Sequence, residues 1–373
     1  MNRKTVPMRI ALIVPPWVPV PPPSYGGLEA VVHALAVELK RAGHLLMLFT
    51  VGGSTCPVPR SWRFRAPQVE MGNVRIELCH VMAAYEAAVG FDIVHDHTVA
   101  GPVDAERFPD VAVVHTLHGA FDEATTEICR RVAPRVPLIA ISEAQRRQAP
   151  LIPVAGVIHH GVMAEEFPIG KGDGGYCVFI GRMSHTKGVH LAIDAARHAG
   201  VDLVIAAKMR TAEEHAYFAA EVEPRLGGHA RYVGEVDFHD KVALLGGARA
   251  LVFPITWPEP FGMVMIEALA CGTPVLAFPS GSAPEVVDHG ITGLLCADVD
   301  EMASAIAAAS NLDRAACRAA AEGRFSARRM AKDHVALYDS VLSGGPPPPL
   351  AAVGSAPAGA RATLACTSER VGS

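Results

Sequence analysis

Residues 175–208, GYCVFIGRMSHTKGVHLAIDAARHAGVDLVIAAK, decide the fold. The first third is an apolar run typical of a buried strand. The middle has apolar residues at helical spacing and ends at a glycine, and VDLVIAAK is a second buried strand. A strand, a helix and a strand joined by short loops form a βαβ unit with parallel strands.

The same order of elements occurs at the start of the chain. RIALIV at 9–14 is a strand, LEAVVHALAVELKRAGH at 28–44 a helix, and LLMLFTVGG at 45–53 a second strand. Each unit is followed by further apolar runs, and in the first half these runs have polar residues at their C-terminal ends, where open α/β sheets bind ligands. The chain is therefore predicted to be an α/β protein with two Rossmann-like domains facing each other across a cleft.

A glycine-rich stretch, FPIGKGDGG at 167–175, predicts the junction between the domains. The helix SARRMAKDHVALYDSVL near the end is expected to cross back to the first domain, and the Pro/Gly/Ala-rich tail is expected to be disordered. The predicted parts are an N-terminal domain at 1–166, a C-terminal domain at 167–325, the last helix at 326–343 and the tail at 344–373.

The composition excludes several classes of protein. The 373 residues are 50% hydrophobic and carry a formal net charge of -5 without a basic block, which argues against a nucleic-acid partner. Eight cysteines without a C-x-x-C pair favour a reduced, cytoplasmic protein. The apolar run near the N-terminus is broken by Pro15 and Pro16, so a buried strand is expected there and not a signal peptide.

The loop GRMSHTKG at 181–188 is the first candidate ligand site. It places Arg182 and Lys187 beside a helix N-terminus, where backbone N–H groups already favour an anion. A phosphate or diphosphate is the ligand that this pattern indicates, and a solvated loop is the alternative. Gly26 and Gly27 occupy the equivalent place in the first half, although a glycine pair also occurs in ordinary tight turns.

Two acids stand in the apolar stretch WPEPFGMVMIEALACGTP at 257–274. Glu259 precedes a proline and must be extended, so it belongs to the loop before the helix, whereas Glu267 lies inside the helix. A buried carboxylate needs hydrogen-bond donors, which sugar hydroxyls can supply. The alternative for Glu267 is an ion pair with a lysine or arginine from elsewhere in the chain.

Histidines gather at predicted strand ends in the first half, in HDH at 95–97, HTLH at 115–118 and HH at 159–160. A metal site is one interpretation, and hydrogen bonding to a ligand in the cleft is the favoured one. The sequence contains no G-x-S-x-G, H-E-x-x-H or Walker motif, and no G-x-G-x-x-G follows the first strand, which argues against a nicotinamide enzyme.

Taken together, EPFGMVMIEALACGTPVLAF and GRMSHTKG resemble the E-x7-E and phosphate-binding segments of retaining glycosyltransferases of family 4, with the GT-B fold. YGGLEAVVHALAVELKRAGH, HTLHG, ISEAQ and GSAPEVVDHGITGLL agree in order, so the resemblance covers about residues 8 to 340. One departure is VIHHGV at 157–162, where many relatives have Pro-Asn-Gly.

The resemblance implies a role for each matched residue. Glu267 would hold the ribose of a nucleotide. Glu259 would hold the donor sugar with the backbone N–H groups of Phe261, Gly262 and Met263. Arg182 and Lys187 would neutralise the diphosphate leaving group, Gly26 and Gly27 would close on the donor, and His118 would face the sugar.

The activity implied is the retaining transfer of a hexose from a nucleotide sugar such as UDP-glucose, with neither a metal nor a cofactor required. The acceptor, whether a small molecule, a glycan or a lipid-linked group, is not specified by any motif, and neither is the oligomeric state. A nucleotide-sugar 2-epimerase and a non-catalytic nucleotide-sugar sensor are the alternatives.

Overall fold

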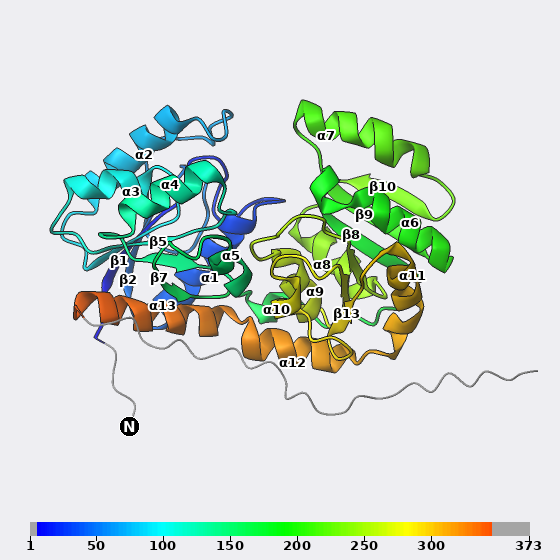
Figure 1. The fold of residues 1–373 in the computed structure, drawn as a ribbon. Coiled ribbons are helices and arrows are strands. Elements are labelled where there is room, and N and C mark those ends of the chain that lie inside the picture. The colour runs from blue at the N-terminus through cyan, green and yellow to red at the C-terminus, as the bar shows by residue number, and fades with distance from the viewer. Residues whose placement is uncertain (1–5, 345–373) are drawn as a thin grey trace, which may run out of the picture.

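The computed structural model describes residues 6–344, and the tail predicted to be disordered lies outside these residues apart from Gly344. Two parallel sheets form two domains side by side, each with helices on both faces (Figure 1). This arrangement confirms the predicted fold class.

The N-terminal sheet has seven strands in the order β3-β2-β1-β4-β5-β6-β7. All neighbouring strands are parallel, so the carboxyl ends of the strands meet along one edge, and the order reverses between β1 and β4. The strands are β1 Arg9–Ile13, β2 Leu45–Thr50, β3 Arg60–Trp62, β4 Ile93–Asp96, β5 Val113–Thr116, β6 Leu138–Ala140 and β7 Val154–Val157.

The C-terminal sheet has six parallel strands in the order β10-β9-β8-β11-β12-β13, which again reverses next to the first strand of the domain. The βαβ unit predicted from residues 175–208 forms as β8, α6 and β9. The strands are β8 Tyr176–Arg182, β9 Asp202–Lys208, β10 Ala230–Gly234, β11 Leu251–Phe253, β12 Val275–Ala277 and β13 Gly293–Leu295.

Helices bury both faces of each sheet. In the N-terminal domain α1 packs on one face, whereas α2 and α4 pack on the other. In the C-terminal domain α6 and α11 cover one face, and α8, α9 and α12 the other. The helices are α1 Gly27–Arg41, α2 Val74–Ala87, α3 Gly101–Asp104, α4 Glu123–Val132, α5 Glu143–Gln148, α6 Val189–Ala199, α7 Ala212–Tyr217, α8 Phe238–Gly247, α9 Met263–Ala270, α10 Ala283–Val286, α11 Val299–Ala308, α12 Arg314–Arg324 and α13 Ala327–Leu342.

The last helix crosses back to the N-terminal domain, as predicted (Figure 1). Met330, Leu337 and Tyr338 of α13 are buried in the core cluster that α1 forms with the N-terminal sheet. Arg329 ties the start of α13 to the chain between the domains, because its Nη2 donates to the carbonyl oxygens of His159 and His160 at 2.6 and 3.0 Å. The interdomain connection is therefore built from two chain segments and not from one linker.

Two further observations concern the chemistry of the described chain. All seven cysteines within residues 6–344 are free thiols, and six of them are buried. No helix in this part of the chain has both the length and the apolar character needed to cross a bilayer.

Candidate active site

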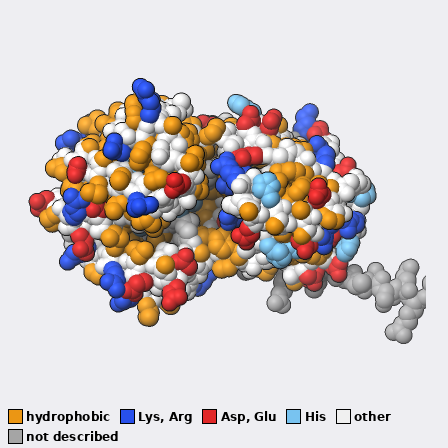
Figure 2. Space-filling view, turned by 90° about the horizontal axis from the view of Figure 1, so that it is seen from above, with side chains coloured by type: hydrophobic (Ala, Val, Ile, Leu, Met, Phe, Trp, Pro, Cys, Tyr) orange, Lys and Arg blue, Asp and Glu red, His pale blue; other side chains and the backbone are white. Residues whose placement is uncertain are grey.

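A cavity of about 670 Å³ opens between the two domains, at the edge where the carboxyl ends of both sheets face each other. The surface is visibly hollowed between the domains (Figure 2). Most of the residues predicted for the site line this cavity: Gly26, Gly27, Lys187, Glu259, Gly262, Met263 and Glu267. Arg182, Phe261 and His118 do not line it.

Glu259 lies on the loop between β11 and α9, as its place before a proline predicted. The segment after β12 holds this loop, since the backbone N–H of Ser282 donates to the Glu259 carbonyl at 3.0 Å. Gly281 makes this approach possible: it has a φ of +58°, and a Cβ there would lie 2.3 Å from backbone atoms of Glu259. The loop is thus fixed before any ligand binds.

The Glu259 carboxylate is almost fully buried and has two protein donors. Its Oε2 accepts hydrogen bonds from Lys187 Nζ at 2.5 Å and from Trp257 Nε1 at 2.7 Å. Lys187 ends a short 3-10 turn between β8 and α6 and is itself 6% exposed. Burial lowers the pKa of the Lys187 ammonium, while the Glu259 carboxylate raises it and the Arg182 guanidinium lowers it further. The pair puts an ammonium group and a carboxylate side by side on the cavity wall.

Arg182 stands at the end of β8, in register with Lys208 at the end of β9. Its guanidinium is partly buried. Although it is not part of the cavity wall, its charge acts on the pKa values of Lys187, Lys208 and Tyr25. It therefore contributes positive potential to the same end of the cavity.

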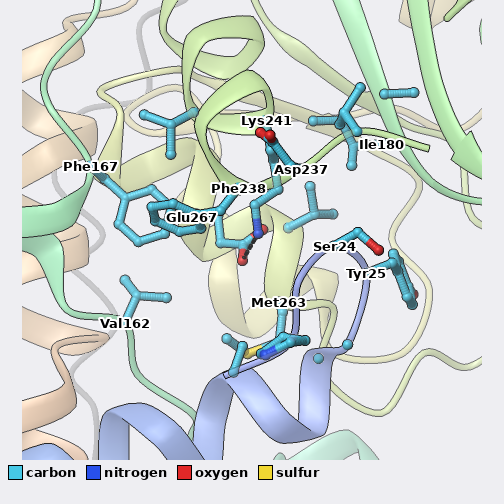
Figure 3. A pocket seen from close by; sticks show the side chains of 18 of the residues that line it. Ser24, Tyr25, Val162, Phe167, Ile180, Asp237, Phe238, Lys241, Met263 and Glu267 are labelled. Atoms are coloured by element: carbon cyan, nitrogen blue, oxygen red, sulfur yellow. Dashed lines mark hydrogen bonds and ion pairs between the residues drawn. The ribbon is translucent and has the colours of Figure 1, made fainter. Parts of the chain in front are cut away.

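Glu267 points from α9 into the cavity, and Lys241 Nζ on α8 donates to its Oε1 at 2.6 Å (Figure 3). The predicted alternative for Glu267, an ion pair with a distant lysine, is thus present in the structure. It leaves the ligand role open, because no described residue donates to the other oxygen, Oε2, and both side chains line the cavity.

Removal of the Lys241 charge tests this pair. In Lys241→Met, Glu267 would remain buried without its cation, so we expect a loss of about 1–3 kcal/mol in the free energy of unfolding. The double variant Lys241→Met/Glu267→Gln should recover much of that loss because no unpaired charge remains. Urea denaturation of the unaltered protein, of the single variants Lys241→Met and Glu267→Gln and of the double variant measures the coupling, and additive losses in the double variant would contradict it.

The glycine pair lies at the N-terminus of α1, opposite α9. Gly26 is the N-cap residue, and a Cβ there would lie 2.7 Å from Pro22 Cβ. At Gly27 a Cβ would lie 3.7 Å from Met263 Cγ of the other domain. On the facing side Gly262, with φ +78°, caps α9. Free N–H groups of two helix N-termini therefore face the same cavity from opposite domains.

Hydrogen bonds between the two domains, which were not predicted from the sequence, lie at one side of the cavity. Ser24 Oγ and the backbone N–H of Tyr25 donate to Glu235 Oε1 at 2.6 and 3.2 Å, and Arg210 Nη2 holds the same carboxylate at 3.1 Å. Lys208 Nζ lies 4.4 Å from the centroid of the Tyr25 ring. Figure 3 shows Ser24 and Tyr25 on the loop that reaches over from the N-terminal domain. The two domains are thus in direct contact beside the ligand space.

His118 follows β5 and is not among the residues that line the cavity. Its Nε2 is 2.9 Å from His97 Nδ1, and its ring stacks on His160 with centroids 5.2 Å apart. The His160 ring in turn meets the edge of Phe261, which is buried beside the Glu259 loop. His118 is therefore linked through His160 to the loop that carries Glu259.

The histidines do converge in the structure, with their rings packed against one another. Within residues 6–344 no group of three or more His, Cys, Asp or Glu side chains is arranged to hold a metal ion. Burial lowers the pKa of His115 and His334 to about 4 and that of His118 to about 3. These imidazoles are neutral near pH 7, so they can serve as hydrogen-bonding groups but not as cations.

Because these histidines are buried in the neutral form, we expect the free energy of unfolding to fall in mild acid. An unfolded histidine takes up a proton near pH 6.5, but these buried ones do so near pH 3–4. The unfolded chain therefore binds more protons, and stability falls as the pH drops through this window. Burial raises the pKa of Asp96 and Glu29 to about 7, which acts in the opposite direction.

Histidines outnumber these two carboxyls, because His80 has a pKa lowered to about 4 and His95, His97 and His160 have pKa values well below 6.5. We expect a net loss of about 2 kcal/mol or more in the free energy of unfolding between pH 6 and pH 5. Urea titrations at each pH measure it. A free energy that stays constant or rises over this interval would show that the cluster does not titrate as described.

Comparison with known proteins agrees with the two-domain site. The family model for glycosyl transferases group 1 matches residues 164–324, and that for glycosyltransferase family 4 matches residues 25–166. The chain belongs to the group 1 glycosyltransferases of the GT-B fold. Most of the cavity wall in both domains therefore lies within the matched segments.

Two curated group 1 relatives show how much of the chain is shared. A glycogen synthase of Mycobacterium tuberculosis is 29% identical, over 84% of this chain and 88% of its own length. A D-inositol 3-phosphate glycosyltransferase of Mycolicibacterium paratuberculosis is 28% identical, over 86% and 88%. The similarity thus extends over both domains of this glycosyltransferase.

Solved structures of similar shape include other glycosyltransferases. AviGT4, an enzyme of avilamycin A biosynthesis, superposes with a TM-score of 0.70 at 25% identity, over 91% of this chain and 99% of its own. HepE of Anabaena, solved in complex with UDP-glucose, has a TM-score of 0.70 at 21% identity, over 90% of this chain and all of its own. Sucrose-phosphate synthase of Thermosynechococcus elongatus has a TM-score of 0.76 at 20% identity, over 91% and 100%.

Proposed function

We propose that this glycosyltransferase moves a hexose from a nucleoside-diphosphate sugar, of which UDP-glucose is the first to test, to an acceptor with retention of configuration. The observation that carries the proposal is the pair of buried acid–lysine contacts on one cavity wall, Glu259 with Lys187 and Glu267 with Lys241. HepE, a structure of the same fold, binds UDP-glucose, which makes this donor the natural choice.

We propose one orientation of the donor along the cavity wall, with the nucleoside at Glu267 and the sugar at Glu259. The ribose hydroxyls would donate to Glu267 Oε2, which no described protein group occupies, while Lys241 stays bonded to Oε1. The diphosphate would lie between the N-termini of α1 and α9, near Lys187 and Arg182. The sugar would lie beside Glu259, which can accept from a sugar hydroxyl through Oε1 while Oε2 holds Lys187.

The reaction requires the bond between the anomeric carbon and the diphosphate oxygen to break, with its electron pair going to the phosphate. Lys187, Arg182 and the helix N–H groups would stabilise this developing charge, which is the most effective use of a preorganised site. The acceptor hydroxyl would attack from the same face and give its proton to the departing phosphate oxygen. Because cations of the protein neutralise the diphosphate, we propose that no metal is needed.

One incubation separates this proposal from its alternatives. The protein is mixed with UDP-glucose labelled in the sugar and with a pool of cellular acceptors, and the products are separated. Free UDP with label in a new compound supports transfer. An isomerised sugar nucleotide would indicate an epimerase, and bound but unchanged donor would indicate a sensor, and either result would contradict the proposal.

A further inference from the structure

Five histidine rings form a continuous column from the last helix to the Glu259 loop. It begins on α13, passes the ends of β4 and β5, and ends on the ring of Phe261. The ring centroids of successive members are 5.0, 4.0, 5.1 and 5.2 Å apart, in the order His334, His95, His97, His118 and His160. The role proposed for His118 uses only one of these rings.

His97 is the member that touches His118 by a hydrogen bond. The distance of 2.9 Å joins His97 Nδ1 to His118 Nε2, and one of these two nitrogens must carry the shared hydrogen. His97 is 4% exposed, and its other nitrogen, Nε2, is buried without a partner among the described atoms. Whether the shared hydrogen lies on His97 or on His118 therefore depends on whether the buried His97 Nε2 carries a proton.

Only two arrangements of neutral rings are possible. If His118 Nε2 is the donor, His97 must carry its own proton on Nε2, as a buried N–H without an acceptor. If His97 Nδ1 is the donor, its Nε2 is a bare ring nitrogen. Orphaned buried N–H groups are the rarest unsatisfied groups in folded proteins, so the second arrangement is favoured.

A charged ring on either residue is disfavoured by the surroundings. Burial is the first cause of the lowered pKa of both His97 and His118, and the neighbouring imidazoles His95, His115 and His334 lower one or both further. On the remaining side lies His160, whose own pKa is lowered by burial and, further, by nearby His118, His334, Arg329 and His159. No carboxylate among these contacts compensates a positive charge.

We propose that His97 is a positioning residue that holds His118 as its Nδ1–H tautomer. His118 is only partly buried, and no described protein group is bonded to its Nδ1. It therefore presents a hydrogen-bond donor, and not a base, to an oxygen of the sugar or the acceptor. His160 stacks on the ring of His118, with an angle of 21° between the two planes. The inference rests on the proposed function for the identity of that oxygen, and on the hydrogen-bond geometry and burial of the two rings for the tautomer.

The tautomer is measured directly in the intact protein labelled with ¹⁵N-histidine. Long-range ¹H–¹⁵N NMR spectra distinguish the two tautomers, and His118→Gln identifies the signals of His118 by their loss. We expect His118 to carry its proton on Nδ1. A proton on Nε2, or a charged ring at pH 7, would overturn the proposal whether or not transferase activity is found.

A matched pair of variants tests the positioning role. In His97→Asn the side-chain amide stands where Nδ1 stood and can still donate to His118, whereas His97→Leu cannot. We expect His97→Leu to lower kcat about tenfold, the effect of one lost hydrogen bond, with the donor KM nearly unchanged. His97→Asn should stay within about threefold of the unaltered protein. Equal losses in both variants, with the His118 spectrum unchanged in each, would show that His97 only fills space.

Discussion

Lys187→Ala is expected to lower kcat by about two to three orders of magnitude, the usual result of removing one preorganised group that stabilises developing charge. Lys187 is the buried cation nearest the carboxylate assigned to the sugar, with Nζ at 2.5 Å from Glu259 Oε2. Without it, the charge on the departing diphosphate would lose its buried cation on the cavity wall. Steady-state release of nucleotide with saturating donor measures the loss.

The controls separate chemistry from folding. Lys171 is an exposed lysine between the domains, so Lys171→Ala removes the same charge away from the cavity and should turn over normally. Lys187→Ala also leaves Glu259 buried with Trp257 as its remaining donor, and the melting temperature shows how much stability this costs. A folded Lys187→Ala that retains normal turnover would place the diphosphate elsewhere.

Glu267→Gln and Glu259→Gln should have separable effects. Glu267 is assigned to the ribose, which free UDP and UDP-glucose share, so its loss should weaken both ligands by about 1–3 kcal/mol, the range for hydrogen bonds to a charged group. Glu259 is assigned to the sugar, so Glu259→Gln should bind UDP almost normally while losing turnover. Calorimetric titration of UDP and of UDP-glucose against both variants measures the difference.

The outcome has two informative alternatives. If Glu259→Gln loses affinity for free UDP and Glu267→Gln keeps it, the donor lies in the opposite direction along the wall. If neither variant changes binding or turnover, both acids serve only their lysines, and the ion pairs with Lys187 and Lys241 are structural.

The sequence predicted the features that depend on neighbours along the chain. The extended geometry of Glu259 follows from the proline after it, and the place of Glu267 within a helix follows from the apolar spacing around it. The strand, helix and strand that begin at residue 175 predicted the second domain, because a βαβ unit is recognised within one continuous segment.

Features that depend on distant segments could not be predicted in this way. Lys241 contacts Glu267 because α8 packs beside α9. Nothing in the sequence of α8 distinguishes Lys241 from the other lysines of the chain as the partner of Glu267. Ser24 meets Glu235 across 211 residues and between two domains. The histidines were visible as a cluster of strand ends, but their order and hydrogen bonds depend on the register of parallel strands and on α13.

A crystal structure of the protein with UDP-glucose tests the central claim most directly, because it locates every part of the donor at once. We predict the diphosphate within hydrogen-bonding distance of Lys187 Nζ and close to Arg182, the ribose hydroxyls on Glu267 and the glucose beside Glu259. Binding of the nucleotide outside the interdomain cavity, or a diphosphate that touches neither Lys187 nor the N-termini of α1 and α9, would contradict the account.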